Sequence, residues 1–372
     1  MAGNGGIIGP VNTVTNGCAA CATAPGIWQM NTVYDFVKNS DWVYNFTDQD
    51  YMVVAGGGGG GGNTGAAGGG GGGGGYRTSY ANPCAAAISL KWGSSYPITV
   101  GAGGVGGIST PAPAGGPVAP TSGVDSTFQT ITSAGGGAGG SCSNYGTPGG
   151  SGGGGGQGPF ACGIGSYYNG PGCAGQGNSP TAPTALGGPQ GNAGGTGWLT
   201  YWTPSGNTNM QGGGGGGANA VGADASAPIP NLSPGGAGKA NSITGSPVTY
   251  AGGGGGGNGR QGPLSPTGGS PGGAGGGGKG GWCGDGAGAT PCAEGVDGTE
   301  NLGGGGGGQG NGPAGAPPGR GKGGGGGKGI VIVRLPSAVP VAVSPGCNSV
   351  ATCVGPANDK VATFNVSGTL TL

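Results

Sequence analysis

The chain has 372 residues, of which 112 are glycine and 30 are proline, and 11 basic residues balance 11 acidic ones. Glycine runs without a Gly-X-Y period exclude collagen, and the low charge argues against a disordered chain. Neutrality also leaves no basic surface for nucleic acid, so no nucleic-acid partner is expected. The longest apolar stretch starts at Ile330 and is cut at Arg334. That is far short of the ~20 residues of a membrane helix, so no membrane insertion is expected.

The first predicted segment, residues 1–43, is an attachment segment with one short helix. Apolar residues between Ile27 and Val37 recur at a spacing close to one helical face. We therefore expect a helix within 27–42.

The second predicted segment, residues 44–335, is a glycine-rich domain with a small β base. Stretches rich in β-branched and aromatic residues adjoin the glycine runs, which predicts strands that continue into or out of them. These stretches are 41–46, 51–55, 96–100 and 329–335. A third segment, 336–372, is predicted to be a C-terminal β extension. The base should hold most of the conventional hydrophobic core.

The glycine runs themselves predict an unusual packed body. Runs such as Gly56–Gly62, Gly68–Gly75 and Gly303–Gly308 are separated by Pro, Asn, Ser and Thr segments typical of turns. Glycine can form the left-handed polyglycine II helix, whose N–H and C=O groups all point outward and must bond neighbouring chains. Pure runs should be central, and runs diluted with Ala, Asn, Gln or Lys should lie outside. The expected fold class is therefore mostly irregular and β, with a packed polyglycine II bundle.

Catalytic motifs are not convincing in this composition. The chain has no histidine, so Ser-His and Cys-His nucleophile pairs are excluded. GxGxxG matches arise by chance at this glycine content, and the phosphate-loop-like stretch around Lys239 lacks the required first glycine and Ser/Thr. Asp48 and Asp50 fit a solvated turn better than a carboxylate pair. We expect no enzyme activity, no cofactor and no metal.

The ten cysteines leave two readings open. The close pairs Cys162/Cys173, Cys283/Cys292 and Cys347/Cys353 suit local disulfides. Small buried thiols are about equally compatible with the pattern.

Three motifs in this order carry a resemblance to a known family. They are "YMVVAGGGGGGG" from Tyr51, "YPITVGAGGVGG" from Tyr96, and "GGGGGKGIVIVRL" from Gly323. Together they resemble the glycine-rich domains of tailed-phage tail fibres and tip adhesins, over roughly 44–335. Residues 25–42 are similar to an element found in structural proteins of marine phages. In the related adhesins of T-even-type phages, packed polyglycine helices carry loops that touch the host receptor.

The resemblance implies a virion surface protein, on the tail or the capsid, that is a tail fibre or host-receptor-binding adhesin. Its partners would be other virion proteins, copies of itself and a glycan or protein receptor. A capsid decoration or head-fibre protein is the alternative. An ice-binding protein is a third hypothesis, disfavoured by the long irregular segments between the runs.

Candidate contact residues follow from where the aromatic residues gather. They lie between glycine runs and are Phe160, Tyr167, Tyr168, Trp198, Tyr201 and Trp202. Aromatic rings suit sugar or protein recognition, but capping of the glycine body against water is the favoured alternative, because few other apolar side chains could cover its ends. Assembly candidates are Trp28, Tyr34, Trp42, Phe364 and Leu370. Residues 361–372 read as an orphan strand, which predicts pairing with another chain.

Overall fold

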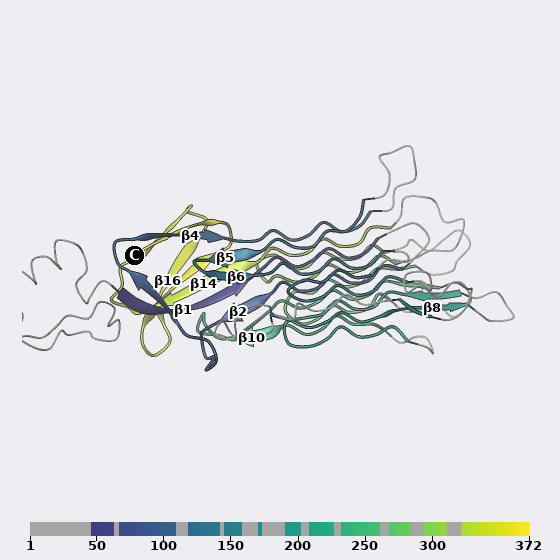
Figure 1. Cartoon of the computed structure of the whole chain (residues 1–372), viewed down its shortest axis with the longest axis horizontal. Coiled ribbons are helices and arrows are strands. Elements are labelled where there is room, and N and C mark those ends of the chain that lie inside the picture. The colour runs from purple at the N-terminus through teal and green to yellow at the C-terminus, as the bar shows by residue number, and fades with distance from the viewer. Residues whose placement is uncertain are drawn as a thin grey trace, which may run out of the picture.

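The structure is a computed structural model that describes residues 46–62, 67–108, 118–141, 145–157, 170–172, 190–201, 208–226, 232–260, 268–283, 293–310 and 321–372. These residues form strands, turns and long extended segments, with no helix among them. The helix expected within 27–42 lies outside the described residues. Strands gather at one end of an elongated molecule, and the glycine runs extend from them side by side (Figure 1). The fold is thus mostly β and irregular, as expected.

Two antiparallel sheets form the base. The first has the order β16-β17-β14-β1-β2, with β3 also pairing β1. Its strands are β1 (Phe46–Val54), β2 (Tyr76–Thr78), β3 (Ile88–Lys91), β14 (Ile330–Leu335), β16 (Ser349–Val354) and β17 (Asp359–Phe364). The second has the order β15-β18-β4-β5-β6. Its strands are β4 (Ser95–Thr99), β5 (Ser126–Phe128), β6 (Ile131–Ser133), β15 (Ala342–Ser344) and β18 (Gly368–Thr371).

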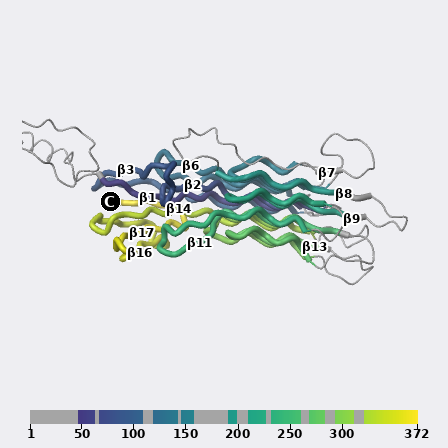
Figure 2. The backbone as a smooth tube through the Cα atoms, turned by 90° about the horizontal axis from the view of Figure 1, so that it is seen from below, coloured from purple at the N-terminus to yellow at the C-terminus, as the bar shows by residue number. Residues whose placement is uncertain are grey.

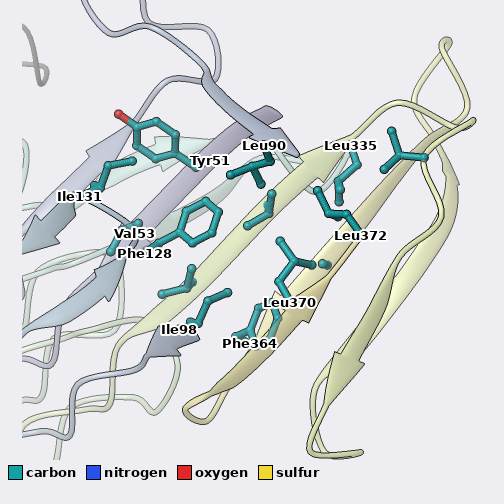
Figure 3. Close-up of a cluster of buried hydrophobic side chains, with 14 residues drawn as sticks. Tyr51, Val53, Leu90, Ile98, Phe128, Ile131, Leu335, Phe364, Leu370 and Leu372 are labelled. Carbon is teal, nitrogen blue, oxygen red and sulfur yellow. The ribbon is translucent and has the colours of Figure 1, made fainter. Parts of the chain in front are cut away.

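The hydrophobic core lies in this base, as the sequence predicted. β1 and β14 are buried on both faces because β-branched and aromatic side chains alternate between two apolar clusters. Tyr51 and Val53 of β1 face the second sheet and pack in one cluster with its Phe128 and Leu370, together with Phe364 of β17 in the first sheet (Figure 3). The intervening Met52 and Val54 of β1 pack instead into the other cluster.

A hairpin of β10 (Lys239–Asn241) and β11 (Val248–Tyr250) contributes to this second cluster. Arg334 of β14 ties the hairpin to the first sheet. Its guanidinium lies 2.9 Å from the Asp359 carboxylate and donates to the Ile243 carbonyl at 3.1 Å and to the Tyr80 hydroxyl at 3.2 Å. Burial and, to a lesser extent, the charge of Tyr76 raise the pKa of Tyr250 to about 12.

The expectation of an unpaired C-terminal strand is wrong. β17 pairs with β14 and β16, and β18 pairs with β15 and β4, all within this chain. Phe364 and Leu370 are fully buried in the core. The open edge from which their assembly role was inferred therefore does not exist. Residues 336–372 complete both base sheets, because β17 pairs with β14 in the first and β18 with β4 in the second, and their apolar side chains join the core cluster.

The glycine runs form a body held by backbone hydrogen bonds. The run Gly56–Gly61 illustrates the pattern, which repeats every three residues. Its N–H groups donate in rotation to three antiparallel neighbours, at 2.8–3.1 Å, in segments 121–124, 324–327 and 69–72. Its carbonyls accept in rotation from three parallel neighbours, in segments 136–139, 104–107 and 306–309. Each backbone polar group of this run therefore has a partner without help from side chains.

Glycine is required inside this body because no space remains for a side chain. A Cβ on Gly71 would lie 2.1 Å from the Gly58 carbonyl oxygen, and one on Gly305 would lie 2.0 Å from the Gly71 oxygen. The uninterrupted runs of six or more glycines are buried, as predicted, whereas the shorter run Gly323–Gly327 lies outside and is partly exposed. Diluted runs lie outside, with side chains at every third residue, as at Val105 and Lys322.

Three of the described cysteines fit neither a disulfide nor a buried thiol. Cys84, Cys347 and Cys353 are exposed free thiols, so Cys347 and Cys353 form neither a disulfide nor buried packing.

Candidate functional site at the distal end

The distal end of the glycine body, opposite the base, is the candidate site. Here the runs enter a five-stranded sheet of order β13-β12-β9-β8-β7 (Figure 2). Its strands are β7 (Gly170–Gly172), β8 (Gly197–Tyr201), β9 (Thr208–Gln211), β12 (Asn258–Arg260) and β13 (Trp282–Cys283). Runs start and finish here because glycine gives way to Asn, Gln, Ser and aromatic residues. The distal end therefore carries polar and aromatic side chains that the glycine body lacks.

The ends of the runs are closed by polar side chains. Gln157 receives a hydrogen bond from the Ala67 N–H at 2.8 Å through its side-chain oxygen and donates its own N–H to the Ala67 carbonyl at 3.0 Å. Ser141 donates through Oγ to the Gly62 carbonyl at 3.0 Å. Both residues are buried. They replace the glycine neighbours that an interior run finds along its length.

A second polar cluster closes the opposite side of the same end. Ser233 donates to the Gly212 carbonyl, and its N–H donates to the Ser270 hydroxyl at 3.1 Å. Ser270 in turn donates to Asn258 Oδ1 at 3.3 Å. All three side chains are nearly inaccessible to solvent. Sequence reasoning treated Ser and Asn only as turn formers and missed this role. The available signal was that these residues directly adjoin glycine runs.

Apolar side chains surround this end at the surface. Tyr145 is 53% exposed, Leu232 44% and Val118 43%. Trp198 of β8 is half-buried, with Pro171 and Gln211 as its cross-strand partners. Exposed aromatic and aliphatic groups beside amides offer contact area together with hydrogen-bonding groups. These groups make the distal end a candidate contact surface.

The predicted contact residues are only partly placed. Trp198 lies in the distal sheet, and Tyr201 is the last residue of β8. Phe160, Tyr167, Tyr168 and Trp202 lie outside the described residues, as do the assembly candidates Trp28, Tyr34 and Trp42. Sequence reasoning overlooked Tyr145 because it stands alone between two short glycine stretches. Its large exposed area makes it a further contact candidate.

In the described ranges, no group of three His, Cys, Asp or Glu residues is placed to hold a metal ion. The same ranges hold no helix with the length and apolar character needed to span a membrane.

Comparison with known families gives one clear result. The model of the glycine-rich domain family matches residues 36–336, which is most of the chain. The chain belongs to the glycine-rich domain family. The match takes in the glycine body and the strands β1 and β14 that open and close it. No curated protein and no solved structure shows a significant match to the chain.

Proposed function

We propose that this glycine-rich domain protein is a surface protein of a tailed-phage virion. It acts as a tail fibre or adhesin whose body is a bundle of polyglycine II helices. The base and N-terminal segment attach it to other virion proteins and to copies of itself, and the distal end contacts a glycan or protein on the host cell. The observation that carries the proposal is the separation of a backbone-bonded body from an end that bears the side-chain variety.

The hydrogen bonds support the helical assignment. A polyglycine II helix has three residues per turn and no internal hydrogen bonds, so its polar groups point outward in three directions. The three-residue rotation of partners around Gly56–Gly61 matches this geometry. An experimental structure with φ near −75° and ψ near +145° along this run would support the assignment. Extended β values near φ −140° would refute it.

The mechanical character of the body supports a display role. Interior glycine backbones in van der Waals contact leave no room for rearrangement, and each run is bonded to several others. Specific recognition needs side chains, and the described surface offers exposed aromatic and aliphatic groups around the distal end. A rigid spacer that carries contact groups at its far end is the architecture that an attachment protein needs.

The experiment compares binding of purified protein to candidate host cells and competition with phage adsorption. Replacing Tyr145 and Trp198 by Ser should weaken binding at least tenfold, about 1.4 kcal/mol, as expected for interface aromatic residues. Val221→Ser is the matched control, because Val221 is 63% exposed but lies on an outer run near the base. The control should bind like the natural protein.

A second variant tests the wider set of predicted aromatic contact residues. Changing Tyr167, Tyr168, Trp198, Tyr201 and Trp202 together tests contact against capping. Contact predicts normal thermal stability with lost adsorption, and capping predicts lower stability with adsorption retained at low temperature. If the intact protein binds no cells and antibodies against it label the capsid, a decoration or head-fibre role replaces the adhesin proposal.

A further inference from the structure

The outermost glycine runs of the body, like the edge strand of a sheet, present backbone groups that have no neighbouring run to bond. Every outer run carries backbone N–H groups that point away from the body, and these could bond a further run from another molecule. Along the interior run Gly56–Gly61 such groups meet a carbonyl, as Gly58 N–H meets the Gly72 oxygen at 2.8 Å. At the surface, something else must take that place.

Side-chain oxygens take that place at several points around the body. Three are aspartates: Asp125 accepts from the Gly135 N–H at 2.8 Å, Asp224 from the Thr196 N–H at 2.7 Å, and Asp297 from the Gly325 N–H at 2.7 Å. Two are threonines: Thr121 accepts from the Val105 N–H at 2.8 Å, and Thr147 from the Ala138 N–H at 2.7 Å.

These five residues share a position in the fold. Each lies on an outer run and is exposed, and each reaches across to the backbone of the adjacent run. The three aspartates follow a small or branched residue in the same way, as Val124-Asp125, Ala223-Asp224 and Val296-Asp297. The carboxylate therefore occupies the site from which a neighbouring glycine carbonyl would accept.

Gly325 shows why this matters. A Cβ there would lie 3.4 Å from its nearest neighbour, so this outward-facing glycine is not required by packing, unlike the other described glycines of its run. Its backbone is therefore accessible to another chain, with Lys322 and Lys328 on either side and Asp297 across its N–H. Here the Asp297 carboxylate takes up the Gly325 N–H, which would otherwise be free to bond a carbonyl of another chain.

We infer that Asp125, Asp224, Asp297, Thr121 and Thr147 close the glycine lattice laterally and so prevent a second copy from adding its own runs to the body. The outward N–H groups already donate to these carboxylates and hydroxyls, so they are not available to a carbonyl of another chain. Loss of the acceptors opens a docking surface whose partner is the glycine backbone of another copy. Closure of this kind would operate wherever the protein is located.

The test compares two triple variants of equal charge. Asp125→Ala, Asp224→Ala, Asp297→Ala removes the acceptors, and Asp125→Asn, Asp224→Asn, Asp297→Asn keeps a side-chain oxygen. Both change the formal net charge from 0 to +3, since 11 basic residues then face 8 acidic ones instead of 11. Self-association is measured by sedimentation velocity over a range of protein concentrations, with the natural protein alongside.

The Ala variant should form dimers and larger species at concentrations where the Asn variant matches the natural protein. Amide exchange at Gly325 should be about tenfold faster in the Ala variant, as expected for the loss of one hydrogen bond. Equal association of the two triple variants would overturn the inference. If the Ala triple does not fold, Thr121→Val and Thr121→Ser decide: only the valine variant should associate, and identical behaviour refutes closure.

Discussion

Two adjacent glycines, Gly325 and Gly326, allow the packing of the body to be tested one residue apart. Both lie on the same outer run, and neither has the positive φ that would itself require glycine. A Cβ on Gly325 would make only ordinary van der Waals contacts, with its nearest neighbour at 3.4 Å. A Cβ on Gly326 would lie 2.0 Å from the Gly57 oxygen and 2.5 Å from its carbonyl carbon. Alanine at the two positions should therefore have opposite effects.

The magnitudes follow from these contacts. Gly325→Ala should stabilise the protein by about 0.4–1 kcal/mol, because alanine restricts the unfolded chain at no steric cost in the folded one. Gly326→Ala must push its run away from Gly57. That movement breaks the bonds from Gly57 N–H to the Gly327 oxygen, at 2.9 Å, and from Gly60 N–H to the Gly324 oxygen, at 2.8 Å. Two buried bonds lost with their partners unsatisfied cost about 2–5 kcal/mol.

Equilibrium urea unfolding of the two variants and the natural protein measures this difference. The unfolding midpoint should rise slightly for Gly325→Ala and fall clearly for Gly326→Ala, with similar slopes. Equal midpoints would show that the body tolerates side chains between its runs. A higher midpoint for Gly326→Ala would refute close backbone packing altogether.

Three further outcomes are expected. Gly71→Val should leave the protein insoluble or protease-sensitive, because its Cβ would meet the Gly58 carbonyl at 2.1 Å, whereas Lys322→Val, on an outward position, should stay folded in the same proteolysis assay. The contribution of Tyr250 to the free energy of unfolding should be complete below about pH 10 and be lost between pH 10 and 12, because Tyr250 ionises near 10 when unfolded and its pKa is about 12 when folded; Tyr250→Phe should reduce that fall in pH-dependent denaturation. Arg334→Met should lower the free energy of unfolding by about 3–5 kcal/mol, because it leaves the partly buried Asp359 carboxylate and the Ile243 carbonyl without their donor. Thermal or urea unfolding measures this, and an unchanged midpoint would contradict it.

The strands of the base and the central position of the long glycine runs could be predicted from the sequence. The β-branched stretches at 51–55, 96–100 and 329–335 lie in β1, β4 and β14. β1 and β14 are packed on both faces, whereas β4 buries only Ile98 on one face. Central placement of pure glycine runs also followed from steric reasoning alone, since any Cβ separates neighbouring backbones. These conclusions rest on local composition, which a single sequence displays directly.

What the sequence could not supply was the pairing between distant segments. Residues 361–372 read as an orphan strand because their partners, β14, β16, β4 and β15, are identified only by the folded register. The polar closures at Gln157, Ser233 and Asn258 were missed for the same reason: each bonds a backbone group of a different run. Among the contact candidates, only Trp198 and Tyr201 have a described backbone, both in the distal sheet.

The pairing of β1 with β14 has a consequence for how the chain reaches this structure. Met52 lies opposite Ile332, and the central run Gly68–Gly75 bonds segments as far along the chain as Gly303 and Gln309. Folding rates fall as contacts become more distant in sequence, because the entropy cost of closing a long loop comes before the stabilising contact forms. A nascent chain therefore has neither a complete core nor a closed central run until its last fifth has been synthesised. Acquisition of structure should be late and cooperative, and fragments that end before β14 should remain unfolded.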